Sequence, residues 1–260
     1  MGILNVTPDS FSDGNRYFNP GAAVQRGLQM VQEGADIIDV GGESTRPGAE
    51  AVTLEEEKRR VIPVVESLCA RLRPGAASGP VVSIDTSKAE VARLAMEAGA
   101  SIINDVTALK HDPRMEEVAG EFGAGVILMH MQGMPRVMQD NPRYTNVAAE
   151  VSQFLVSRIA DLAGRRIDIA RLAVDPGIGF GKTLRHNVDL LGSLGELRAA
   201  SGRPVVVGLS RKSFLGKLTG RDVDQRLIPG IAAVSFCLTR GADVVRVHDV
   251  RDSVDAVKVV

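Results

Sequence analysis

Eight short apolar runs recur along the chain, and each ends in a polar residue or a tight glycine turn. The runs occupy residues 2–6, 37–42, 81–85, 102–106, 126–130, 172–176, 205–210 and 244–249. The polar residues at or near their ends are Asn5, Asp39, Asp85, Asn104, His130, Asp175, Ser210, Arg246 and His248. A strand that only fills a core needs no such residue, so the series predicts one site assembled from eight strand ends. In a (β/α)8 barrel enzyme the chemistry lies at these ends.

Helical patterns with recognisable start and stop signals separate the apolar runs. The start signals are Asn19-Pro20, Asp112-Pro113 and two capping-box spacings, Thr53 with Glu56 and Ser87 with Glu90. The glycines expected to end helices are Gly34, Gly99 and Gly241. Such alternation predicts a parallel sheet with crossover helices. Eight units in 260 residues favour a single (β/α)8 TIM-barrel domain over residues 1–260, with a short last helix over 252–260.

Composition excludes several classes of protein. The net charge is −1, so we expect no nucleic-acid partner, and any anion must be held by a local cluster. No apolar run approaches the roughly 20 residues of a membrane span, and no signal peptide is expected because Met1 leads straight into a strand. Cys69 and Cys237 are far apart in helical patterns, which favours buried free thiols and a reducing cytoplasm.

Three connections that follow predicted strands are richer in functional side chains than linkers need to be. The first spans 7–18, long for such a loop in a barrel, and the others span 41–50 and 210–214. They contain Asp9, Phe11, Asp13, Thr45, Arg46, Pro47, Arg211, Lys212 and Ser213. Any one of them could be an ordinary surface loop, but together they indicate the catalytic face.

Basic residues gather near the last two strands. Lys212, Arg246 and His248 lie where barrel enzymes often bind phosphate, and a helix expected to begin near Arg211 would add backbone N–H groups. A solvated surface arginine is the alternative for Arg246. Alternation within residues 244–249 opposes it, because it puts valines on one face and Arg246 with His248 on the other.

Acidic and amide groups converge on the same mouth. Asp39, Asp85, Asn104 and Asp175 suit a ligand that presents several N–H donors, such as the edge of a heterocycle. Capping of the next helix could explain one or two of them but not the set. We therefore expect a bipolar site, with acids for a heterocycle and bases for a phosphate group.

The segment after the sixth strand contains glycines and a lysine but lacks the spacing of a phosphate-binding P-loop. We interpret its glycines as allowing Phe180 to approach a flat ligand closely.

These residues stand in motifs that resemble the dihydropteroate synthases, the sulfonamide-target enzymes of bacterial folate synthesis. The motifs are NVTPDSFSDG (5–14), DVGGESTRPGA (39–49), SIDTSK (83–88), INDV (103–106), MHMQG (129–133), DPGIGFGKT (175–183), GLSRKSFLG (208–216) and RVHDV (246–250). They follow the family's order over nearly the whole chain, and the first two are highly specific. The resemblance implies a transferase that joins 6-hydroxymethyl-7,8-dihydropterin diphosphate to 4-aminobenzoate and releases diphosphate.

The resemblance also implies a role for each site residue. Asn5 would bind the Mg²⁺ that holds the diphosphate, and Asp13, in preference to Asp9, would stabilise a pterin cation. The pterin would be bound by Asp85, Asn104, Asp175 and Lys212, and the diphosphate by Thr45, Arg246 and His248. The aminobenzoate pocket would contain Phe11, Arg46, Pro47, Phe180, Lys212 and Ser213. The chemistry would depend on Asp13, Lys212, Arg246 and His248.

A homodimer is also expected from the resemblance, although residues 226–233 depart from the small or polar residues usual at that family contact. Three alternatives stay open. One is a pterin-binding methyltransferase domain of related fold, which would have no use for the second-substrate loops. The others are a Schiff-base lyase that uses Lys212 and a catalytically inactive binding homologue.

Overall fold

Eight parallel strands form the centre of the computed structural model, which describes residues 1–7, 19–44, 51–72, 79–133 and 137–260. Each predicted apolar run contains one strand. They are β1 (Gly2–Asn5), β2 (Ile37–Gly41), β3 (Val81–Asp85), β4 (Ile102–Asp105), β5 (Gly125–Met129), β6 (Leu172–Asp175), β7 (Val206–Gly208) and β8 (Val244–Arg246). The strand prediction is confirmed at all eight positions.

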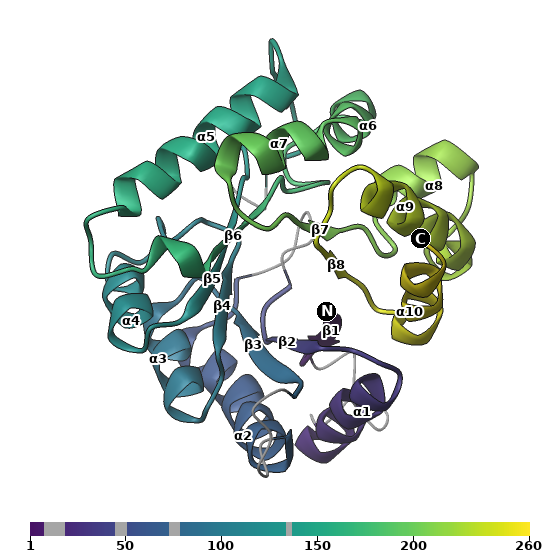
Figure 1. Cartoon of the computed structure of the whole chain (residues 1–260). Coiled ribbons are helices and arrows are strands. Elements are labelled where there is room, and N and C mark those ends of the chain that lie inside the picture. Colours follow the sequence, from purple (N-terminus) through teal and green to yellow (C-terminus); the bar gives the residue numbers. More distant parts are fainter. Residues whose placement is uncertain (8–18, 45–50, 73–78, 134–136) are drawn as a thin grey trace.

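Helices surround the strands on the outside of the ring (Figure 1). They are α1 (Pro20–Gln32), α2 (Leu54–Leu72), α3 (Ala89–Glu97), α4 (Met115–Glu121), α5 (Val147–Leu162), α6 (Leu184–Gly192), α7 (Leu194–Ser201), α8 (Ser213–Thr219), α9 (Leu227–Thr239) and α10 (Val250–Val259), with short 3-10 turns at Ile169–Arg171 and Val223–Gln225. Within the described residues, none of the helices is long and apolar enough to cross a membrane.

The strands close into a barrel in sequence order. Strands β1 to β6 pair as one parallel sheet, and β7 pairs with β8. Single parallel bridges join the two pieces, Gly2 with Val247 and Val174 with Val205. At the first joint the amide of Ile3 donates to the carbonyl oxygen of Val247 over 2.9 Å. The predicted (β/α)8 barrel is confirmed, with its circuit completed by these two short joints.

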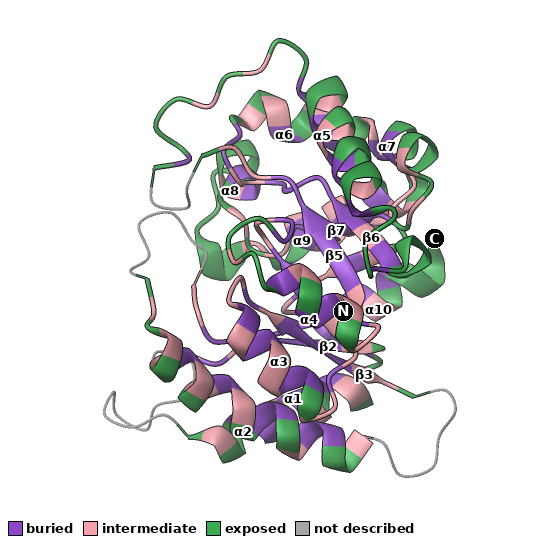
Figure 2. Ribbon diagram, turned by 90° about the vertical axis from the view of Figure 1, so that its left-hand side faces the viewer, coloured by how far each residue is buried: buried purple, intermediate pink, exposed green. Residues whose placement is uncertain are grey.

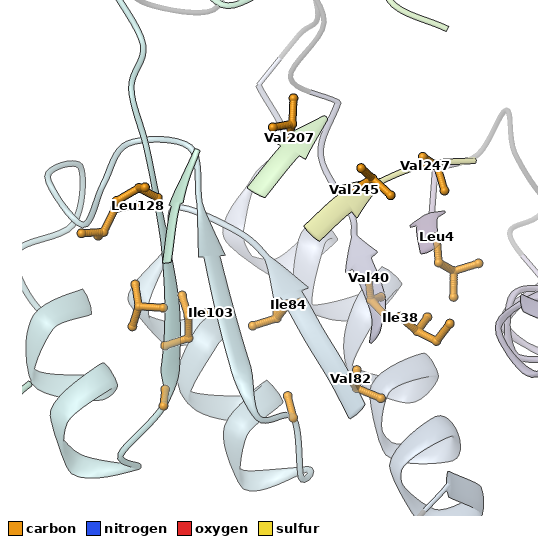
Figure 3. Close-up of a cluster of buried hydrophobic side chains, with 14 of the residues drawn as sticks. Leu4, Ile38, Val40, Val82, Ile84, Ile103, Leu128, Val207, Val245 and Val247 are labelled. Carbon is orange, nitrogen blue, oxygen red and sulfur yellow. The ribbon is translucent and has the colours of Figure 1, made fainter. Parts of the chain in front are cut away.

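Alternation along the strands sorts side chains into an outer and an inner set. The outer set packs under the helices and forms the main core; Figure 3 labels Leu4, Ile38, Val40, Val82, Ile84, Ile103, Leu128, Val207, Val245 and Val247. Figure 2 shows the same division at larger scale, with buried strands and helices that are exposed only on their outer faces.

The inner set changes from apolar to polar along each strand. At the amino-terminal ends of the strands, Met1, Ile127 and Val206 are buried together, packed against Ile37, Ile102, Ala173 and Val244. Two residues further along four of these strands stand Asp39, Asn104, Asp175 and Arg246. Since side chains two apart in a strand share a face, the polar residues form the next layer inside the barrel. The strand pattern therefore places the polar layer toward the carboxyl ends, where barrel enzymes carry their chemistry.

Helix starts agree with the predictions in part. Asn19 caps α1, since its side chain accepts from the amide of Ala22. Thr53 accepts from the amide of Glu56, but the Glu56 carboxylate pairs with Arg59 and so does not complete a capping box.

Two predicted starts were wrong in detail. Lys88, not Ser87, precedes α3, and it makes no side-chain cap. Asp112 caps α3 instead, because its carboxylate accepts from the amide of Ala89, the first residue of that helix. It also accepts from the amide of Arg114, and α4 begins only at Met115.

Helix ends and the two cysteines match the predictions. Gly34, Gly99 and Gly241 have φ of +102°, +106° and +103°, which glycine adopts at little cost. The last helix, α10, begins two residues before the expected position. Cys69 and Cys237 are buried free thiols.

A left-handed turn follows β4 without glycine. Ala108 and Leu109 have φ of +55° and +61°, a conformation that disfavours residues with a Cβ. The buried guanidinium of Arg158 donates to both of their carbonyl oxygens, over 2.8 and 3.2 Å, and pairs with Glu116 at 2.7 Å. Arg158 therefore holds α5 against a strained turn that lies four residues after Asn104.

We expect Arg158→Met to lower the free energy of unfolding by about 2–4 kcal/mol, because it leaves two buried carbonyl oxygens without a partner and removes the buried one of the two ion pairs of Glu116. Urea unfolding followed by circular dichroism measures the change. Arg165→Met is the matched control, since Arg165 pairs with the same Glu116 from a side chain that is 54% exposed. The control should cost less than about 1 kcal/mol; equal losses would show that Arg158 has no special role.

Candidate active site

The guanidinium of Arg246 joins β8 to two acids across the barrel interior. Its Nε donates to Asp39 Oδ2 and its Nη2 to Asp85 Oδ2, each over 2.6 Å. Asn104 Nδ2 donates to the same Asp39 oxygen over 3.0 Å. Strands β2, β3, β4 and β8 thus contribute one side chain each to a single network, as expected for groups on the inner face.

The network is short of partners on its acidic side. Among the described residues, Asp39 Oδ1 and Ser83 Oγ are buried without a hydrogen-bond partner. Burial raises the pKa of Asp85 to about 7, with the charges of Asp39 and Glu57 adding to the effect and Arg246 opposing it. Carboxylates kept this far from water favour a ligand that brings N–H donors.

Asp175 and Lys212 form a second charged group beside the first. Asp175 Oδ1 accepts from the amide of Gly177 over 2.7 Å, and burial raises the pKa of Asp175 while Lys212 opposes the rise. Burial also lowers the pKa of Lys212 to about 8, against the attraction of Asp175. The Lys212 ammonium donates to the carbonyl oxygen of Ile178 and lies 4.5 Å from the centre of the Phe180 ring.

Gly208 lies beside both basic side chains. A Cβ there would lie 3.7 Å from Lys212 Nζ and 4.0 Å from Arg246 Cβ. Both distances are ordinary van der Waals contacts, so Lys212 and Arg246 lie directly beside this end of β7.

His248 lies at the edge of the network with Asn5 and Ser210. Its Nδ1 is 3.1 Å from Ser210 Oγ and its Nε2 is 3.5 Å from Asn5 Nδ2. Among the described residues, no group of three or more His, Cys, Asp or Glu side chains could hold a metal ion. Asn5, to which the resemblance assigns a metal-binding role, lies at this edge of the network.

The start of the helix after β7 differs from the prediction. Helix α8 begins at Ser213 with Lys212 at its cap, whereas the sequence placed Arg211 and Lys212 in its first turn. Arg211 has a φ of +61° and pairs with Asp249 at 2.6 Å. The guanidinium of Arg211 is therefore bound to the residue at the start of α10, and Ser213 is exposed.

The structure brings together most of the predicted site residues that it describes, but it does not keep the predicted poles apart. Arg246 was expected among the bases, and it contacts the acids directly. Alternation along a strand predicts the face on which a side chain lies, but not which residues on other strands it contacts. The sequence therefore could not show the contacts of Arg246 with the acids. Asp9, Phe11, Asp13, Thr45, Arg46 and Pro47 lie outside the described residues.

A buried lysine next to the site was not predicted from the sequence. Lys182 is 3% exposed, and its ammonium lies 3.0 Å from His130 Nδ1. Burial lowers the pKa of Lys182 to about 7 and, with the charge of Lys182, lowers the pKa of His130 to about 3. The only sequence indication was His130 at a strand end, since Lys182 was considered only as part of a possible P-loop.

Fold and site together define a barrel enzyme whose mouth combines buried carboxylates with basic side chains. The family described as "Pterin binding enzyme" matches residues 1–248. A dihydropteroate synthase of Escherichia coli (strain K12) is 46% identical over 260 residues, covering 100% of this chain and 89% of the relative.

Two solved structures of Xanthomonas albilineans dihydropteroate synthase are also similar. The one with 4-aminobenzoic acid has a TM-score of 0.90 and 49% identity, and the one with 7,8-dihydropteroate has a TM-score of 0.86 and 46% identity. Each comparison covers 99% of this chain and 90% of the other. The chain belongs to the pterin-binding enzyme family and, within it, to the dihydropteroate synthases, which are transferases of folate biosynthesis.

The buried histidine makes stability depend on pH. In the unfolded chain His130 has the ordinary histidine pKa of 6.5, whereas in the folded protein its pKa is about 3. The unfolded state therefore holds more protons between these values, and the folded state loses stability as the pH falls through this window.

We expect the unfolding free energy of the wild type to fall relative to that of His130→Gln as the pH drops from 7 to 4.5, by up to roughly 1.4 kcal/mol per pH unit. Urea titrations of both proteins across this range test the difference. His111→Gln, at an exposed position, controls for the substitution itself. A difference that stays constant with pH would contradict the assignment.

Proposed function

We propose that the described site condenses 6-hydroxymethyl-7,8-dihydropterin diphosphate with 4-aminobenzoate, giving 7,8-dihydropteroate and diphosphate. The observation that carries this proposal is the network in which Arg246 lies between Asp39 and Asp85, next to Asp175 and Lys212. It supplies acceptors for a nitrogen heterocycle and cations for an anionic leaving group within one barrel mouth.

Asp85, Asn104 and Asp175 bind the pterin in this proposal. They come from adjacent or nearby strands, and the two carboxylates are held away from water by burial. A carboxylate can accept two parallel N–H bonds from the amino-pyrimidine edge of a pterin. Lys212, which lies close to Asp175, can donate to the pterin carbonyl.

Arg246 and His248 act on the diphosphate. Arg246 already uses Nε and Nη2 on Asp39 and Asp85, and a guanidinium has further N–H donors that can reach a phosphate oxygen. Charge that develops on the departing diphosphate strengthens such contacts in the transition state. Thr45 adds a hydroxyl in this proposal.

Asn5 is proposed to hold Mg²⁺ together with the diphosphate. The donor set fits, because Mg²⁺ commonly takes one or two protein oxygens and completes its shell with phosphate oxygens and water. When bound, the ion supplies positive charge to the leaving group.

The second substrate is proposed to bind beside Phe180, Lys212 and Ser213, in a pocket completed by Phe11, Arg46 and Pro47. The bond to diphosphate breaks early and leaves a pterin cation, and the amine then attacks the methylene carbon, so no protein nucleophile is needed. Asp13 stabilises the pterin cation in this scheme.

A direct assay tests the function. The protein is incubated with the pterin diphosphate, 4-aminobenzoate and Mg²⁺, and diphosphate and dihydropteroate are measured; omission of Mg²⁺ or addition of EDTA should abolish turnover. Cobalamin-dependent methyl transfer in place of condensation would support the methyltransferase alternative. Borohydride trapping of substrate on Lys212 would support a lyase, and pterin binding without turnover would support an inactive homologue.

Assembly as a cytoplasmic homodimer is part of the same proposal. Helix α9 exposes Leu227, Ile228 and Phe236, with Ile228 81% exposed, and a second copy would cover this surface. Light scattering on the purified protein tests the dimer, and Ile228→Lys should shift it toward monomer.

We expect Asp175→Asn to weaken pterin binding by about 1.5–3 kcal/mol, because one charge-assisted hydrogen bond is lost. Isothermal calorimetry with the bare pterin measures the change. Asp189→Asn, on the partly exposed side of α6 where it pairs with Arg185, is the matched control. Unchanged affinity in Asp175→Asn would remove this residue from the pterin site.

Because Arg246 contacts Asp39 and Asp85 directly, its replacement should affect both turnover and pterin binding. Arg246→Ala should lower turnover by about 100-fold or more through loss of the leaving-group contact. It should also weaken the bare pterin, by about tenfold, because Asp39 and Asp85 lose their shared cation and Asp85 becomes harder to ionise.

Turnover with the diphosphate substrate and calorimetry with the bare pterin separate the two effects. Arg246→Lys should recover only part of the turnover, since a point charge cannot reproduce the guanidinium fork. Equal losses in turnover and pterin affinity would place Arg246 in the heterocycle pocket alone.

A further inference from the structure

Four successive carbonyl oxygens in the β6–α6 loop (residues 176–183) each accept a hydrogen bond from a different side chain. The pairs are Ile178 with Lys212, Gly179 with Gln139, Phe180 with Lys182, and Gly181 with Tyr144. Loops normally leave such oxygens to water. Here the backbone on both sides of Phe180 is held by side chains, and three of them, Lys212, Gln139 and Tyr144, come from outside the loop.

The loop also packs directly on the backbone that follows β5. Gly177 and Gly181 have φ of +69° and +61°. A Cβ at Gly177 would lie 1.9 Å from the carbonyl oxygen of His130, and one at Gly181 would lie 2.3 Å from that of Gln132. The absence of side chains at these two positions brings the backbones into contact, and Lys182 follows immediately.

Lys182 binds both of the backbone segments that meet at this contact. Its ammonium nitrogen lies 3.0 Å from the carbonyl oxygen of Phe180, 3.3 Å from that of His130 and 3.0 Å from His130 Nδ1. These three acceptors match the three N–H bonds of an ammonium. One bond goes to the residue whose ring faces Lys212, and two go to the end of β5.

We propose that Lys182 is a positioning residue that fixes the Phe180 ring at the aminobenzoate side of the site by binding the Phe180 carbonyl oxygen and His130. The inference rests on the proposed function of the site. Lys182 acts through the loop because its three acceptors all belong to the protein. The pterin side depends less on it, since Asp85, Asn104 and Asp175 stand on strands.

The test is Lys182→Met, which keeps most of the side chain and removes the donors. The KM for 4-aminobenzoate should rise at least about tenfold, since small displacements of a binding group have large kinetic effects. The KM for the pterin diphosphate should change less than about threefold. Lys258→Met, at an exposed position of α10, is the control and should leave both constants unchanged.

A double-mutant cycle with Phe180→Ala separates positioning from a general loss of stability. If Lys182 acts through Phe180, then Lys182→Met should change the KM for 4-aminobenzoate little in the Phe180→Ala background. Additive effects would overturn the proposal, and so would an unchanged KM ratio in the single variant. Hydrogen exchange of a peptide covering 177–181 gives a readout independent of activity, and it should increase locally in Lys182→Met.

If Lys182→Met does not fold, Lys182→Gln takes its place, because its shorter neutral side chain cannot span the three acceptors that the ammonium reaches. The same cycle and the same outcomes then apply. Failure of the proposed function is distinguishable, since the wild type would then form no dihydropteroate. If only the inference about Lys182 is wrong, the wild type still turns over. In the variant, the KM values for 4-aminobenzoate and for the pterin diphosphate are then both unchanged or change to the same extent.

Discussion

The ion pairs of Arg246 with Asp39 and Asp85 are the interaction on which the rest of the site depends. They connect β8 with β2 and β3 across the barrel interior, near the joint where only a single bridge closes the ring between β8 and β1. Removing one partner of a buried ion pair leaves an uncompensated charge, which costs several kcal/mol. The same contacts therefore order the barrel mouth and set how readily Asp85 ionises.

Strand alternation gives the barrel interior an apolar layer and a polar layer. The lower inner layer, with Met1, Ile127 and Val206, is apolar and contributes burial. The layer two residues further along carries the acids, the amide and Arg246. Polar groups at this depth are costly, and Asp39 Oδ1 has no partner among the described residues. Stability and chemistry thus come from successive layers of the same strands.

Sequence patterns predicted the strands and the candidate site well because both depend on local periodicity. Each apolar run became a strand, and Asp85, Asn104, Asp175 and Arg246 meet inside the barrel as their positions on one face require. Contacts between distant residues could not be predicted in this way. Lys182 and His130 are separated by 52 positions in sequence, and nothing local to either indicates the other. The wrong helix start at Ser87 has a similar cause, because Asp112 supplies the cap from another connection.

The two sides of the site are therefore held by different means. The groups proposed to bind the pterin stand on strands, whose positions are fixed by the parallel ladder and by Arg246. Phe180 stands on a loop, and a loop gains fixed geometry only when its backbone groups have partners. Lys182, Tyr144, Gln139 and Lys212 supply those partners for four consecutive carbonyl oxygens. Lys212 also interacts with Asp175, so its ammonium group is shared between the loop and the strand ends.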